Sequence, residues 1–121
     1  MCSYTHKMYE RVTTKDIIAV NQAFDAGRIV NTGSLEFAVE QANAQKSWLA
    51  ACALLVRAIL IDHVFEEGNK RTAAAIIIGA FEEQGLLYDR DQVSKSVVAI
   101  LRKNITSIQG IQKVIKYAIK A

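Results

Sequence analysis

The feature that most limits the fold of this chain is the complete absence of proline from its 121 residues. Proline and glycine are the usual residues of turns and loops, and glycine occurs only six times. Hydrophobic residues make up 51% of the chain, and few of them alternate with polar ones as they would in a half-buried strand. This composition predicts an all-α protein, and the length suits one compact domain over residues 1–121.

Helical spacing of the apolar residues divides the chain into segments that predict a compact bundle of about six helices. The expected helices begin near Thr13, Ser34, Ser47, Asn69, Asp89 or Asp91, and Ser107. In the first helix Ile17, Val20 and Phe24 share one face. The segment 47–62 is apolar nearly all round, which predicts a buried central helix, and Gly85 should end the helix that follows.

Membrane and nucleic-acid functions find little support in the sequence. The longest apolar run, from Trp48 to Val56, ends at Arg57, well short of the ~20 residues that a membrane span needs. The N-terminal MCSYTHKMYERV carries charges where a signal peptide needs an apolar stretch. The net charge is only +3, and the two signs are interspersed except near the C-terminus, so no nucleic-acid partner is expected. Cys2 and Cys52 lie far apart, which argues against a disulfide and fits a cytoplasmic protein.

The segment HVFEEGNKRT, residues 63–72, gathers several groups that bind phosphate. A helix that begins near Asn69 carries unpaired amide N–H groups and a partial positive charge at its start. Gly68 lets the backbone turn sharply and a ligand approach closely, and the Asn69 side chain adds a donor. Lys70 supplies a point charge and Arg71 a forked donor for phosphate oxygens.

Two further residues of this segment suit the chemistry of transfer. The carboxylate of Glu67 would repel bound phosphates unless a cation intervened, and Mg²⁺ commonly binds one carboxylate together with phosphate oxygens. His63 can be neutral near pH 7 and accept a proton. Each residue also has an ordinary structural explanation, as a helix cap, a dipole partner or a solvated charge. Their combination within one short segment nevertheless favours a phosphoryl-type transfer site.

This segment resembles the central motif of the Fic/Doc family, in which His, any residue, Phe, any residue, an acidic residue, Gly, Asn, Gly or Lys, and Arg follow one another. The specified positions are matched by His63, Phe65, Glu67, Gly68, Asn69, Lys70 and Arg71. VTTKDIIAVNQAF is similar to the family's first helix, GSLEFAVEQA to its flap segment and GNKRTAAAIIIGAFEEQG to its motif helix. The resemblance covers most of the chain and implies the Fic/Doc fold.

The resemblance also implies ATP as donor, Mg²⁺ as cofactor and a role for each motif residue. His63 would take the proton from a hydroxyl of the target protein, and Glu67 would hold Mg²⁺. Phe65 would anchor the loop in the core. The nucleotide phosphates would be held by an anion hole and two cations, formed by Gly68, Asn69, Lys70 and Arg71.

Two departures from the adenylyl-transferring members resemble the Doc branch, whose members are toxins of toxin–antitoxin pairs and protein kinases that act on a translation elongation factor. Lys70 stands where adenylyl-transferring members usually have Gly, and Ala74 stands where they carry a second Arg. A Lys side chain would fill part of the phosphate pocket and turn the terminal phosphate of the nucleotide toward the target. Val64 replaces a frequent Pro, and Glu67 is one methylene longer than the commoner Asp.

Three hypotheses follow for the function. The first is a Doc-like protein kinase that transfers the γ-phosphate of ATP to a Ser or Thr of a protein target and is restrained by a separate antitoxin. The second is a Fic-type protein adenylyltransferase of the same fold. The third is a catalytically silent nucleotide-binding module, against which the presence of His63 weighs. Thr32 to Glu36 matches only the first part of the family's inhibitory motif, and we interpret this match as chance.

Overall fold

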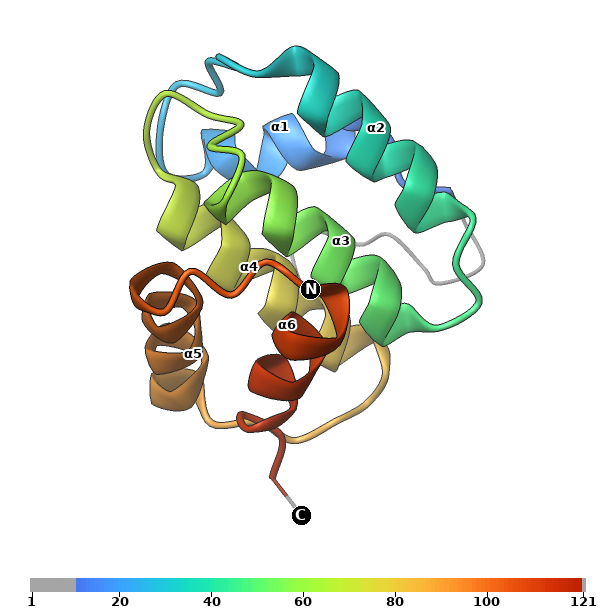
Figure 1. Ribbon diagram of the computed structural model, residues 1–121, viewed down its shortest axis with the longest axis vertical. Helices are drawn as coiled ribbons and strands as arrows, with labels where there is room; N and C mark the ends of the chain where they lie inside the picture. The colour runs from blue at the N-terminus through green and yellow to red at the C-terminus, as the bar shows by residue number, and fades with distance from the viewer. Residues whose placement is uncertain (1–10, 121) are drawn as a thin grey trace.

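The computed structural model describes residues 11–120 of the chain, so the expectations for Cys2 and the N-terminal segment lie outside the described residues. The described part is all-helical, with 65% of its residues in six helices, and confirms the predicted fold class (Figure 1). The helices are α1 (Thr14–Gln22), α2 (Thr32–Asn43), α3 (Trp48–Leu60), α4 (Asn69–Glu83), α5 (Arg90–Arg102) and α6 (Ile108–Lys116).

Most helices begin close to the residues that the sequence predicted, and a local cap fixes each of these starts. The side chain of Thr13 accepts a hydrogen bond from the backbone N–H of Asp16, whose carboxylate accepts one in return from the Thr13 N–H. The helices α3, α5 and α6 are capped by Ser47, Asp89 and Ser107.

The predicted cap at Ser34 is wrong, because α2 starts two residues earlier, at Thr32. Its cap is Asn31, whose side chain accepts from the Ser34 N–H. The amide of Asn31 also donates to the carbonyl of Asp62, at 3.0 Å between nitrogen and oxygen. The same side chain therefore caps α2 and ties its start to the end of the α3 segment.

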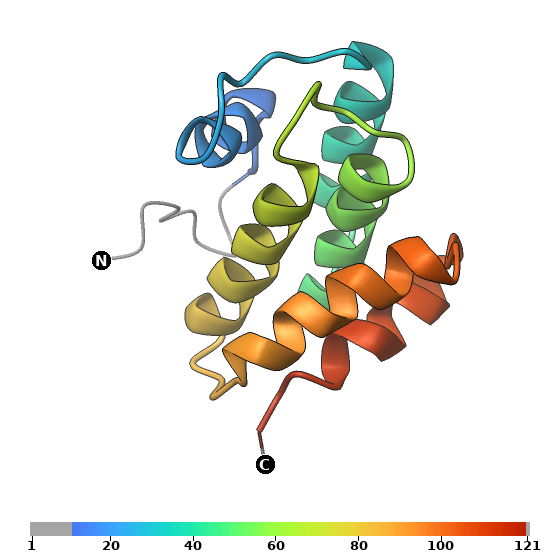
Figure 2. The same ribbon diagram turned by 90° about the vertical axis from the view of Figure 1, so that its left-hand side faces the viewer.

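The helix α3 lies at the centre of the bundle, as predicted for the segment 47–62. It packs against α2, α4, α5 and α6, and nine of its 13 residues are buried. Figure 2 shows α3 and α4 side by side, with α1 and α2 on one side of the pair and α5 and α6 on the other. Within residues 11–120 no helix is long and apolar enough to cross a membrane.

The prediction that Phe24 faces the core with Ile17 and Val20 is wrong. The two aliphatic residues are buried, but α1 ends at Gln22 and Phe24 is 41% exposed in the turn that follows. The inward face of the last turn carries a polar residue instead, the fully buried Asn21. At the end of α4 the prediction for Gly85 is confirmed, since this residue takes the left-handed backbone conformation (φ 69°) just after the helix.

Candidate active site

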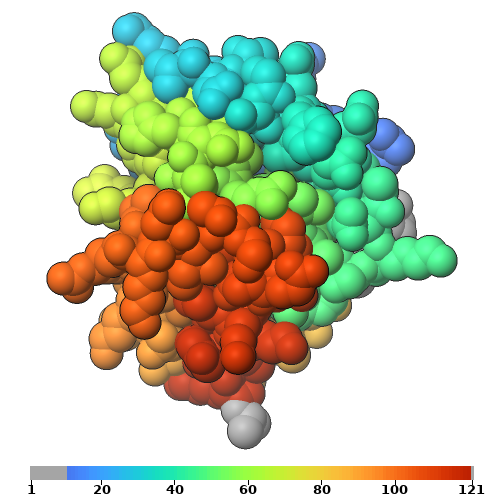
Figure 3. Space-filling model, in the orientation of Figure 1, coloured from blue at the N-terminus to red at the C-terminus, as the bar shows by residue number. Residues whose placement is uncertain are grey.

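The loop between α3 and α4 is fixed to the segment that precedes α2. An antiparallel bridge joins Ile29 to Phe65, and the carbonyl of Val64 accepts from the backbone N–H groups of Val30 (2.8 Å) and Asn31 (3.2 Å). Val64 and Phe65 are fully buried, which confirms the expectation that the aromatic ring anchors the loop in the core. The yellow-green surface of this loop lies beside the segment before α2 in Figure 3. The backbone around the motif is therefore rigidly supported.

Asn69 holds this loop closed from the first turn of α4. Its Oδ1 accepts from the backbone N–H of Phe65 at 3.1 Å, and its Nδ2 donates to the Phe65 carbonyl at 2.8 Å. The ordinary structural explanation for Asn69, that it caps the helix, is wrong, because the capping position is Gly68, in the left-handed conformation (φ 79°). The side-chain amide of Asn69 is engaged with Phe65 and His63, so the backbone N–H of Asn69 is the donor that can face an anion.

His63 is exposed and takes an unusual backbone conformation, with a φ of 53°. Left-handed residues with a side chain cost about 1–3 kcal/mol and persist where their surroundings determine the conformation. The Nδ2 of Asn69 lies 3.3 Å from the His63 Nδ1. Since Phe65 fixes which end of the Asn69 amide is the donor, Nδ1 accepts and the neutral ring carries its proton on Nε2.

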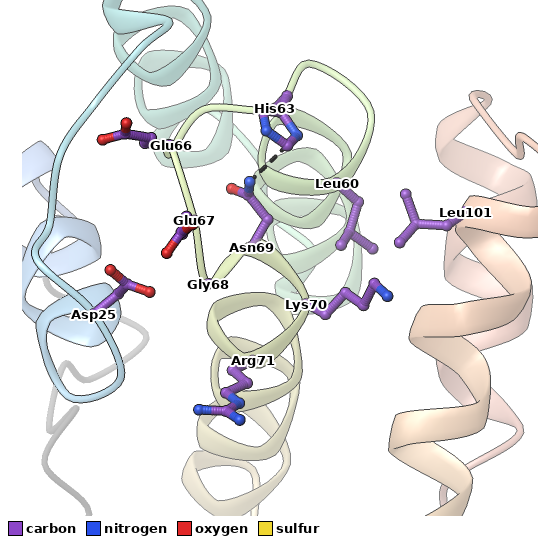
Figure 4. A pocket seen from close by; sticks show the side chains of 10 residues that line it. All are labelled: Asp25, Leu60, His63, Glu66, Glu67, Gly68, Asn69, Lys70, Arg71 and Leu101. Atoms are coloured by element: carbon purple, nitrogen blue, oxygen red, sulfur yellow. Dashed lines mark hydrogen bonds between the residues drawn. The ribbon is translucent and has the colours of Figure 1, made fainter.

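A hollow of about 540 Å³ lies at the start of α4. It brings together all of the predicted site residues, which are His63, Glu67, Gly68, Asn69, Lys70 and Arg71 (Figure 4). Leu60 and Leu101 form an apolar part of its wall. The volume falls in the range of about 300–1,000 Å³ that is usual for small-molecule sites.

The charged side chains divide into two groups around this hollow. In Figure 4 the side chain of Lys70 extends toward Leu101 of α5, whereas the guanidinium of Arg71 extends to the opposite side of α4. The carboxylates of Glu67 and Asp25 are turned toward each other beside Gly68. The hollow is thus lined by Lys70 on the α5 side, and by Arg71 and the acidic groups away from α5.

Asp25 is a site residue that the sequence interpretation missed. It follows α1 in the chain, far from the motif, and reaches the hollow only because the turn after α1 packs against Gly68. Two carboxylates are hard oxygen donors of the kind that Mg²⁺ takes, together with phosphate oxygens and water. Residues 11–120 contain no group of three or more His, Cys, Asp or Glu that could hold a metal. Glu67 and Asp25 alone are thus too few to form a metal site, and they could hold Mg²⁺ only together with phosphate oxygens and water.

Glu66, next to this pair, is engaged elsewhere. Its carboxylate lies 3.3 Å from the Nε of Arg28, and both side chains are more than half exposed. Such a surface ion pair contributes ~0–1 kcal/mol to stability, so its effect on the loop is small.

The comparisons with known proteins found no match. Protein-family models, curated proteins and solved structures were all compared, and none of them matches this chain. The motif residues and the geometry that surrounds them are therefore what indicates the function.

Proposed function

We propose that this chain is a Doc-like protein kinase of the Fic/Doc family, which transfers the γ-phosphate of ATP to a Ser or Thr hydroxyl of a protein target such as a translation elongation factor. The observation that carries the proposal is the convergence on one hollow of a histidine, a carboxylate, a helix start and two cations. These are the groups that a phosphoryl-transfer site needs for proton removal, metal binding and charge stabilisation.

In this proposal the ATP phosphates bind at the start of α4, where the first backbone N–H groups and the positive end of the helix dipole favour negative charge. Lys70 and Arg71 neutralise phosphate oxygens from the two sides of the helix. Glu67, with Asp25 facing it, fits a Mg²⁺ ion. When bound, Mg²⁺ would neutralise charge that develops on the phosphate oxygens during transfer.

His63 is the proposed base. Its imidazole takes the proton of the target hydroxyl as the hydroxyl oxygen bonds to the γ-phosphorus and the bond from that phosphorus to the β–γ bridging oxygen breaks, releasing ADP. For Nε2 to receive this proton, the neutral ring must first carry its own proton on Nδ1. The contact between Asn69 and the His63 Nδ1 must then open, because two N–H groups cannot face each other there.

Lys70 and Ala74 favour phosphate over AMP transfer. The Lys70 side chain lines the hollow, where it leaves less room for the nucleotide than the glycine of adenylyl-transferring members would. Ala74 lies one turn after Arg71 and is partly buried against the core, so α4 presents no second guanidinium at that position. Both features support a nucleotide orientation with its γ-phosphate toward His63.

The proposal extends to the biological setting that the Doc branch implies. The chain would be the toxin of a toxin–antitoxin pair, acting in the cytoplasm on the translation machinery, with a separate antitoxin protein as its regulator. It would need no nucleic-acid partner and no membrane.

Intact-mass analysis of a purified elongation factor, incubated with the chain, ATP and Mg²⁺, tests this function. We expect the factor to gain the mass of one phosphate. A gain of one AMP would instead support the adenylyltransferase hypothesis. Nucleotide binding to the chain without any change in mass would contradict transfer to this target.

A further inference from the structure

Asn21 is a buried polar side chain next to the proposed site that the catalytic proposal leaves without a role. It lies in the last turn of α1 and is fully buried. Its Nδ2 donates to the carbonyl of Glu67 and to the hydroxyl oxygen of Thr72, each at 3.0 Å, and its Oδ1 accepts from the Gly27 N–H at 2.8 Å. The backbone N–H of Gly27 can only donate and the carbonyl of Glu67 can only accept, so these two partners fix which end of the Asn21 amide is oxygen and which is nitrogen.

The bond from Asn21 determines how the peptide between Glu67 and Gly68 is oriented. In a trans peptide the C=O and N–H groups point in opposite directions. The Glu67 carbonyl points inward to Asn21, so the Gly68 N–H points outward, to the side of the hollow that Gly68 lines. No hydrogen bond found within residues 11–120 engages this N–H.

Gly68 is shaped for this arrangement in two ways. Its φ of 79° is a conformation that residues with a side chain rarely adopt. A Cβ atom at this position would also lie 3.0 Å from the Nδ2 of Asn21 and 3.3 Å from the Cβ of Asp25. A side chain at position 68 would therefore push against the amide that holds the Glu67 carbonyl.

We propose that Asn21 is a positioning residue for the anion site, which orients the Glu67–Gly68 peptide so that the Gly68 N–H donates to a phosphate oxygen. This inference rests on the proposed function. Without the Asn21 amide the peptide is free to turn its carbonyl toward the hollow, where the oxygen would repel a phosphate. The residue acts through the backbone and does not itself contact the ligand.

Thr72 provides a matched control, because its hydroxyl is the other acceptor of the same Asn21 amide. Both residues are fully buried, and Thr72→Val removes one of the three hydrogen bonds that Asn21→Ala removes. Only the change at Asn21 releases the Glu67 carbonyl. A loss of affinity that came only from the broken bond between α1 and α4 would appear in Thr72→Val as well, whereas the positioning role predicts that Thr72→Val keeps most of its phosphate affinity.

The test is a titration of the full ¹⁵N-labelled chain with inorganic phosphate, followed by NMR at the Gly68 amide. We expect the wild-type Gly68 signal to shift, and Asn21→Ala to weaken phosphate binding by about 10- to 100-fold, as the loss of one hydrogen bond to a charged group implies. The phosphate affinity of Thr72→Val should lie within about threefold of the wild-type value, a much smaller change than that expected for Asn21→Ala.

The outcomes separate this inference from the proposed function. If wild-type phosphate or ATP titrations shift no amide at the start of α4, the proposed anion site itself is wrong. If the wild type binds and folded Asn21→Ala binds equally well, or Thr72→Val loses as much affinity as Asn21→Ala, the positioning role is overturned. Should Asn21→Ala fail to fold, a crystal structure of the wild type with phosphate decides between the outcomes. A phosphate oxygen within about 3.2 Å of the Gly68 backbone nitrogen supports the positioning role. A phosphate that binds without contacting this nitrogen overturns it.

Discussion

Replacing Asn69 with Ala should destabilise the fold far more than its place at a ligand site would suggest. The variant removes the hydrogen-bond partners of both the N–H and the C=O of Phe65, which lie in the buried base of the loop. An unsatisfied buried polar group costs about 1–3 kcal/mol, so two of them should lower the free energy of unfolding by about 2–6 kcal/mol. Domains of this size are stable by only about 5–15 kcal/mol in total. Urea denaturation followed by circular dichroism measures the difference.

The neighbouring residue supplies the control for this experiment. Lys70 is exposed, and Lys70→Ala should change the free energy of unfolding by no more than about 0.5 kcal/mol. If Asn69→Ala were as stable as Lys70→Ala, the two bonds to Phe65 would not hold the loop. The role of Asn69 would then be limited to binding the ligand.

Three further predictions concern the ligand, the imidazole and the buried thiol. Arg71→Ala should weaken ATP binding by about tenfold or more, because it removes charge-assisted hydrogen bonds, and unchanged affinity in calorimetry would place the ligand elsewhere. In ¹⁵N NMR of the neutral His63 ring, the proton should lie on Nε2 in the free chain and shift toward Nδ1 when Mg²⁺ and ATP are added. A proton found on Nδ1 in the free chain would contradict the hydrogen bond from Asn69 to this nitrogen. Burial raises the pKa of the Cys52 thiol from 9.0 to about 12, so as the pH rises the thiol loses its proton in the unfolded chain before it does in the folded one. The free energy of unfolding should therefore fall by up to about 1.4 kcal/mol per pH unit above pH ~9. Cys52→Ala should lack this part of the slope in urea denaturation, and identical slopes would refute the assignment.

Helix positions could be predicted from the sequence because their signals are local. Thr13, Ser47, Asp89 and Ser107 each precede an apolar face of helical spacing, and each caps a helix in the structure. At α2 two capping residues, Asn31 and Ser34, compete three positions apart. Asn31 caps the helix and also donates to the carbonyl of Asp62. This contact joins distant segments of the chain, and sequence spacing does not reveal it.

The predicted site residues meet at one hollow because they are contiguous in the chain and the turn at Gly68 folds them around one helix start. Asp25 and Asn21 could not be placed there, since their approach depends on how α1 packs against α4. A signal for Asn21 does exist, because it lies one turn after Ile17 on the buried face of α1. A buried amide in such a position requires hydrogen-bond partners from another segment.

The central claim is that His63 and the start of α4 transfer the terminal phosphate of ATP to protein. The most direct measurement supplies ATP labelled either on the γ- or on the α-phosphate, with Mg²⁺, to a cell extract containing wild-type chain or His63→Ala. We expect protein labelling from γ-labelled ATP only. Labelling should be slower by roughly 10²–10⁴-fold with His63→Ala, which should remain folded and bind ATP normally. Label incorporated from the α-phosphate, or equal labelling by the two chains, would contradict the central claim.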